Sequence, residues 1–85
     1  MSYTVEFERN ARKELLALPV AVRERIMEAV QRLAVDPFKS VNVKSLNGGV
    51  FRLRVGDYRV IFSVKTEVLI VLVIKIGHRR EVYRF

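Results

Sequence analysis

The chain of 85 residues has a mass of 9.9 kDa, which is the size of one small domain. Hydrophobic residues form 51% and charged residues 29% of the sequence, a balance typical of globular proteins and unlike that of disordered or collagenous chains. Cysteine is absent and histidine occurs once, which excludes disulfide scaffolds, thiol enzymes and zinc fingers. We therefore expect one domain over residues 1–85 that uses no metal ion or other cofactor.

Two features of the sequence argue against export and membrane insertion. The first residues, MSYTVEFERN, mix acidic and basic side chains where a signal peptide would have an apolar stretch. The longest apolar run, residues 68–74, is far shorter than the ~20 residues that a membrane-spanning helix needs. We expect a cytoplasmic protein that does not contact the membrane.

The positive charge is concentrated in the second half of the chain. Sixteen Lys and Arg against nine Asp and Glu give a net charge of +7. Residues 1–42 hold seven basic and six acidic side chains, whereas residues 43–85 hold nine basic and three acidic ones. Such an asymmetry indicates a surface that attracts a polyanion, most often nucleic acid, although acidic proteins respond to the same field.

The first half of the chain predicts a strand followed by two helices. Residues 3–7 alternate between apolar and polar side chains, which indicates a strand with one buried face. Residues 8–18 and 20–34 repeat apolar side chains at helical spacing, and Pro19 separates them into a helical hairpin. Pro37 ends the second helix, because the residue before a proline avoids the α region.

The second half of the chain predicts β structure. Two alternating segments, residues 51–55 and 58–64, flank Gly56 and Asp57, which fits a hairpin because glycine accepts the positive φ of a two-residue turn. Residues 68–76 are almost wholly aliphatic, as in a central strand, and residues 81–85 are compatible with a short final strand. The predicted class is α+β, with an N-terminal strand, an α-helical hairpin and a three- to four-stranded antiparallel sheet.

The predicted hairpin places three arginines on one face. With Gly56 and Asp57 as the turn, Arg54 pairs with Arg59, and alternation along the strand adds Arg52 to the same side. The opposite side, which we assign to the core, carries Phe51, Leu53, Val55, Tyr58, Val60 and Phe62. No acidic side chain of the hairpin shares the arginine side, so an external anion is indicated, and guanidinium groups bind phosphate oxygens bidentately. The alternative is a solvated face, or ion pairs with acids from elsewhere in the fold.

A second candidate site follows the aliphatic strand. Gly77 allows the chain to turn, and His78 and Arg79 then stand at the end of a strand, where side chains can reach a neighbouring face. A single histidine in a loop is also compatible with an ordinary surface residue. Tyr83 is by default a core or edge-strand aromatic, unless neighbouring cations favour its phenolate form.

These segments resemble motifs of the RelE/ParE superfamily of bacterial and archaeal toxins. Residues 51–60, FRLRVGDYRV, are similar to its "YR(L/I)R-x-G-x-YR(V/L)" hairpin, and residues 76–84 are similar to its closing "GHR…VY" motif. The order of strand, helical hairpin and C-terminal sheet extends the resemblance over essentially the whole chain. Because the basic face and the terminal tyrosine, Tyr83, occur together, the chain resembles RelE more than ParE.

The resemblance implies the toxin component of a type II toxin-antitoxin system, a metal-independent endoribonuclease that cleaves messenger RNA in the ribosomal A site. By position, Arg59 matches the transition-state arginine, Arg79 the arginine proposed to protonate the leaving oxygen, and Tyr83 the proposed general base. Free arginine is a poor acid and free tyrosine a poor base at neutral pH, so His78 is kept as an alternative acid or base. The expected RNA-binding residues are Arg52, Arg54, Lys44, Arg80 and Arg84, the first two at family positions that are usually lysine.

The resemblance also implies a protein partner, an acidic RelB-like antitoxin that forms a hetero-oligomer with the toxin. Two other functions are compatible with the same residues: a ParE-like poison of DNA gyrase without nuclease activity, and a non-catalytic RNA-binding module. The second is disfavoured because Phe51 and Tyr58 are assigned to the core and are therefore not exposed platforms for stacking bases.

Overall fold

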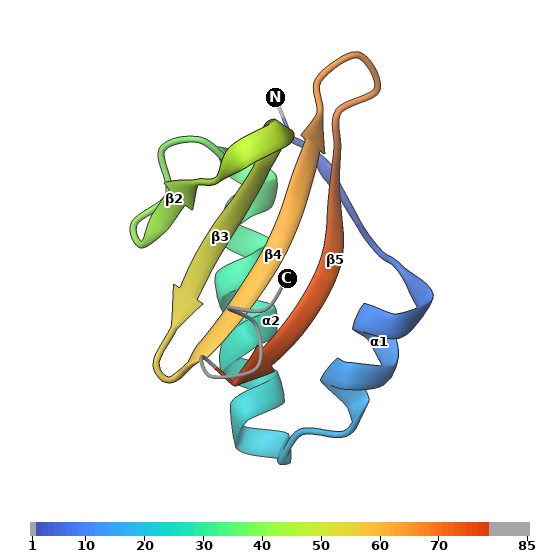
Figure 1. The fold of residues 1–85 in the computed structure, drawn as a ribbon, viewed down its shortest axis with the longest axis vertical. Coiled ribbons are helices and arrows are strands. Elements are labelled where there is room, and N and C mark those ends of the chain that lie inside the picture. The colour runs from blue at the N-terminus through green and yellow to red at the C-terminus, as the bar shows by residue number, and fades with distance from the viewer. Residues whose placement is uncertain (1, 79–85) are drawn as a thin grey trace.

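The computed structural model of the protein describes residues 2–78 as a five-stranded mixed sheet with two helices against it (Figure 1). In chain order the elements are β1 (Thr4–Phe7), α1 (Arg9–Leu16), α2 (Val20–Val35), β2 (Val43–Ser45), the 3-10 turn η1 (Asn47–Gly49), β3 (Val50–Val55), β4 (Tyr58–Lys65) and β5 (Ile70–His78). The α+β class and the order of a strand, a helical hairpin and a C-terminal sheet are confirmed.

The sheet is mixed because the N-terminal strand joins it in parallel. The strand order is β1-β5-β4-β3-β2, in which β1 pairs in parallel with β5 and all other pairs are antiparallel. A parallel pair needs a long connection, and here the two helices and the strands β2, β3 and β4 all lie between β1 and β5 in the chain. The N-terminal strand therefore lies beside the last described strand, at the edge opposite β2 (Figure 1).

Both helices begin and end near their predicted bounds. Pro19 is the N-cap of α2, where its missing N–H costs no helical hydrogen bond and its carbonyl oxygen accepts one from the N–H of Arg23 at 2.9 Å. At the other end of α2, the Oδ1 of Asp36 accepts hydrogen bonds from the backbone N–H groups of Phe38 and Lys39, both at 3.1 Å. These bonds replace the helical pattern and turn the chain towards β2.

The core lies between the helices and one face of the sheet. It contains the largest buried side chain, Phe62, together with Leu53 and Val60 of the β3–β4 hairpin, packed on α1 and α2. Phe51 stacks on Phe62 with ring centroids 5.5 Å apart, and Tyr58 packs at the margin of the same cluster. The predicted core face of the hairpin is confirmed.

Several strand boundaries differ from the sequence prediction. The three-residue strand β2 was hidden in the polar loop, because so short a segment shows no alternation, and only its pairing with β3 defines it. The last described strand begins at Ile70 instead of residue 68, since Val68 and Leu69 form the turn after β4, with Leu69 at a φ of 55°. The final strand expected over residues 81–85 lies outside the described residues. None of the helices within residues 2–78 combines the length and apolar character needed to span a membrane.

Candidate nucleic-acid interface

The β3–β4 hairpin has the register that the sequence predicts. Val55 pairs with Tyr58 and Arg54 with Arg59, so Gly56 and Asp57 form the two-residue turn. Gly56 has a φ of +58°, and a Cβ atom there would lie 3.2 Å from Nη2 of Arg25, which reaches the turn from α2. The positive φ favours glycine at the turn, and any larger residue would also have to displace the end of Arg25.

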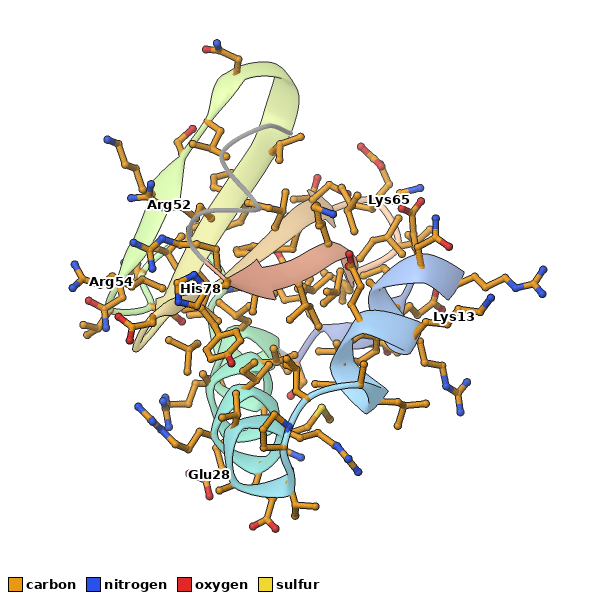
Figure 2. The ribbon with its side chains drawn as sticks, turned by 60° about the horizontal axis from the view of Figure 1, so that its bottom comes forward. Lys13, Glu28, Arg52, Arg54, Lys65 and His78 are labelled. Atoms are coloured by element: carbon orange, nitrogen blue, oxygen red, sulfur yellow. The ribbon has the colours of Figure 1, made fainter. Side chains whose placement is uncertain are left out.

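One face of the sheet gathers four of the predicted RNA-contacting and catalytic cations. Arg52 pairs with Ile61 and Arg54 with Arg59, and β2 adds Lys44 opposite Arg52. We call Lys44, Arg52, Arg54 and Arg59 the arginine face. Figure 2 shows Arg52 and Arg54 on the β3 side of the molecule, away from Lys13 and Lys65. The three arginines share one side as predicted, and β2, which the sequence did not reveal, adds Lys44 to it.

The four cations differ sharply in burial. Arg54 and Lys44 are exposed and Arg52 is half-buried, but Arg59 is only 6% exposed. Nη1 of Arg59 donates hydrogen bonds to the carbonyl oxygens of Tyr58, at 3.2 Å, and Gly56, at 3.5 Å. Alternation predicts the shared face but not this difference in burial, and the hairpin turn holds Arg59 in place.

His78 does not share the arginine face. The sequence places His78 at the end of a strand, where a side chain can reach a neighbouring face, and the register aligns it with Tyr58 and places Gly77 opposite Arg59. The rings of Tyr58 and His78 meet edge to face with centroids 5.7 Å apart. Strand alternation is the reason, because Tyr58 belongs to the core-facing side and its paired residue must follow it.

Comparison with known proteins identifies the family of this chain. The family model described as "ParE toxin of type II toxin-antitoxin system, parDE" matches residues 5–83, a span that includes the arginine face and both helices. The chain belongs to the RelE/ParE toxin family. The resemblance drawn from the hairpin and the closing motif is thereby confirmed.

Relatives of this family cover nearly the whole chain. Toxin RelG of Mycobacterium tuberculosis is 30% identical over 86 residues, which span 99% of each protein. In the toxin-antitoxin complex RelBE2 of Mycobacterium tuberculosis, a chain with 30% identity superposes with a TM-score of 0.81 over 93% of this chain and 100% of its own. In the archaeal RelE-RelB complex of Pyrococcus horikoshii, the corresponding values are 32%, 0.82, 93% and 97%. The fold is therefore that of the RelE toxins within the family.

The remaining residues expected in the toxin's site fall at the C-terminus. Arg79, Arg80, Tyr83 and Arg84 lie outside the described residues. Among residues 2–78, no group of three or more His, Cys, Asp and Glu side chains is placed to hold a metal ion. The described part of the site thus consists of the arginine face and the adjoining turn.

Sequence reasoning missed two side chains that support this site of the toxin. Glu14 of α1 accepts hydrogen bonds from Nζ of Lys75, at 3.0 Å, and from the backbone N–H of Ile76, at 2.9 Å, and so fastens the helix to β5 just before Gly77. Arg25 of α2 packs on the hairpin turn. No local pattern signals the first contact, because its partners are 61 and 62 residues apart.

Proposed function

We propose that the protein is a ribosome-dependent endoribonuclease that cleaves messenger RNA in the ribosomal A site and thereby inhibits translation. One observation carries the proposal: the register of the β2–β3–β4 segment gathers Lys44, Arg52, Arg54 and Arg59 on one face. The family resemblance assigns Arg52 and Arg54 to basic positions and Arg59 to stabilisation of the transition state, and we assign Lys44 to RNA binding beside them.

The reaction is an attack within the RNA strand. The ribose 2′-oxygen forms a bond to the adjacent phosphorus while its proton passes to a base, and the bond from phosphorus to the 5′-oxygen breaks. The leaving oxygen takes up a proton, so the products are a 2′,3′-cyclic phosphate and a 5′-hydroxyl. Negative charge develops on the non-bridging oxygens, where guanidinium donors stabilise it, and removal of one such donor typically costs ~10²–10³ in rate.

Arg59 is the principal stabiliser in this proposal. Its guanidinium is largely removed from solvent, and the carbonyl oxygens of Tyr58 and Gly56 orient it. A donor held in place before the reaction needs little reorganisation when charge develops, and it acts more strongly where water is excluded. Arg54, which is exposed, is suited to binding the incoming strand.

The proton carriers are assigned by the family positions. Arg79 is proposed as the acid for the leaving oxygen and Tyr83 as the base for the 2′-hydroxyl. His78 is the alternative acid or base, and it would approach the phosphate only around the end of β5, because it is aligned with Tyr58. We further assign Arg80 and Arg84 to RNA binding.

The proposed partner is an acidic, RelB-like antitoxin, and the toxin is proposed to act in the cytoplasm as part of a hetero-oligomer. Relatives with 30% and 32% identity occur in a toxin-antitoxin complex and in a RelE-RelB complex. The net charge of +7 suits an acidic partner, since complementary fields accelerate and orient association.

The test adds purified protein to ribosomes that translate a defined message. We expect cuts in phase with the codons, with 2′,3′-cyclic phosphate ends, and no comparable cutting of the same RNA without ribosomes. Intact message at confirmed occupancy of the ribosome would overturn the proposal.

A ParE-like gyrase poison is the second candidate, and the description of the matching family model favours it. The two functions separate in one pair of assays. Trapped gyrase cleavage complexes beside intact message would identify the gyrase poison, whereas codon-phased cuts with unaffected gyrase would identify the ribonuclease.

A further inference from the structure

A depression of about 570 Å³ lies beside the arginine face, between α2, residues 39–42 and the end of β3. Among residues 2–78, four cationic side chains line it: Arg25, Arg32, Lys39 and Arg54. Its lining includes one acidic side chain, Glu28, and the largely buried Ala29 and Leu53. The depression is therefore a concave and strongly electropositive part of the surface.

Within the described part of the chain, no carboxylate pairs with the cations of this depression. Within residues 2–78, none of the four side chains forms a hydrogen bond or an ion pair with another side chain. Glu28 lies three residues after Arg25 and four before Arg32 on α2, where it moderates their repulsion without pairing with either. The described lining thus carries three positive charges in excess, and a polyanion is the ligand that such a site favours.

The rim of the depression is built before any ligand arrives. Asp36 accepts hydrogen bonds from the backbone of Phe38 and Lys39, and Oγ of Ser40 donates to the carbonyl oxygen of Asp36 at 2.7 Å. The N–H of Arg54 donates to the carbonyl oxygen of Asn42 at 3.0 Å. The segment that carries Lys39 is therefore tied to α2 at one end and to β3 at the other, which lowers the ordering cost of binding.

The depression is continuous with the arginine face. Arg54 belongs to both, and the hairpin turn is flanked by two guanidinium groups from different elements. Arg25 packs against Gly56 from α2, while Arg59 donates to the carbonyl oxygen of the same glycine. An extended polyanion that contacts Arg54 can therefore continue around the edge of the sheet and still lie against cationic side chains.

We infer that this depression binds the phosphodiester backbone of the RNA strand that the toxin cleaves, beside the scissile phosphate. The inference rests on the proposed function and extends it with a second phosphate site. A polymer with phosphates at regular intervals engages both sites at once, and each neutralised phosphate adds salt-dependent affinity. An acidic protein would need carboxylates at matching positions, whereas every RNA strand provides the repeat.

The test measures binding separately from cleavage. A fluorescent single-stranded RNA with 2′-O-methyl groups cannot be cut, and its affinity is followed over a series of salt concentrations. The variant Arg25→Gln/Arg32→Gln removes two cations of the depression, and Arg9→Gln/Arg12→Gln removes two exposed cations from α1 as the matched control. Thermal melts establish that both variants are folded.

We expect the depression variant to bind the RNA about tenfold more weakly, with a slope of log K against log salt reduced by about 1.4 for the two lost cations, and the control to match the parent. Equal losses in both variants would overturn the inference, because only overall charge would then matter. Unchanged RNA binding with weaker binding of poly-glutamate would instead assign the depression to an acidic protein. A loss seen with ribosomes but not with free RNA would assign it to ribosomal RNA.

The binding test of the depression is independent of whether the protein cleaves RNA. Failure of the proposed function would appear as intact message on translating ribosomes, even where the depression binds uncleavable RNA. Failure of the inference would appear as unchanged RNA binding in the depression variant, even where the message is cut.

Discussion

Two parts of the molecule use their cations in opposite ways. Where α1 meets β5, Lys75 pairs with Glu14 at 3.0 Å, and the same carboxylate accepts the N–H of Ile76. At the β3–β4 turn, Arg25 and Arg54 have no carboxylate partner within residues 2–78. The first cation fastens a helix to the sheet, and the others remain available to a ligand, so net charge alone does not locate the binding surface.

The largest expected effect comes from changing Arg59, the buried cation of the same hairpin turn. The variant Arg59→Gln is expected to lower message cleavage on translating ribosomes by ~10²–10³, because the oriented positive charge is lost from the arginine face. Lys65→Gln, at the other end of β4, serves as the control and should cleave like the parent. Since Arg59 is 6% exposed, a thermal melt accompanies each assay, and a rate loss explained wholly by unfolding would contradict the catalytic role.

Leu53 tests whether the arginine face depends on the core beneath it. This side chain is 3% exposed, and Leu53→Ala is expected to destabilise the domain by about 2–4 kcal/mol, because it removes buried contacts and leaves a cavity. Urea unfolding gives the free energy. The control Val68→Ala changes a side chain that is 59% exposed and should stay within about 0.5 kcal/mol of the parent. Equal losses in the free energy of unfolding would contradict the assignment of Leu53 to the core.

Variants of Glu14 and Lys75 test the contact between α1 and β5, where an ion pair stabilises the fold. Glu14→Ala is expected to cost about 1–2 kcal/mol, because it leaves the N–H of Ile76 without its acceptor. Lys75→Ala should cost about 0.5 kcal/mol, since a partly exposed ion pair contributes little. Urea unfolding of both variants gives the ranking. If the lysine variant proved the less stable, the backbone bond would not be the main contribution of Glu14.

The smallest expected effect on stability concerns the packing of Arg25 on the hairpin turn, which a variant of Gly56 tests. Gly56→Ala is expected to cost about 1 kcal/mol, because φ is +58° there and the new Cβ atom would lie 3.2 Å from the guanidinium of Arg25. Thermal melts in the Arg25→Gln background should show a smaller cost, since the close contact is then removed. The same cost in both backgrounds would attribute the whole effect to backbone conformation.

Local patterns were sufficient for the hairpin and its core face. Alternation along residues 51–55 and 58–64, with Gly56 between them, specified the register, because a shift of one residue would expose the apolar set. The same pattern placed Arg52, Arg54 and Arg59 on one side, and the motifs around them identified the family. The face of His78 follows in the same way from the residue with which it pairs in β4. That pairing depends on how β5 docks against β4, which the sequence does not specify.

The sequence by itself determined the α+β class, the order of elements, the hairpin register and the membership of the RelE/ParE family, because each depends on periodicity or motifs within a short stretch. Only the tertiary structure decided the parallel docking of β1, the burial of Arg59 and the grouping of Arg25, Lys39 and Arg54 around one depression. The physical reason is that these features arise from contacts between distant segments, whose proximity depends on packing of the whole domain and leaves no trace in local spacing.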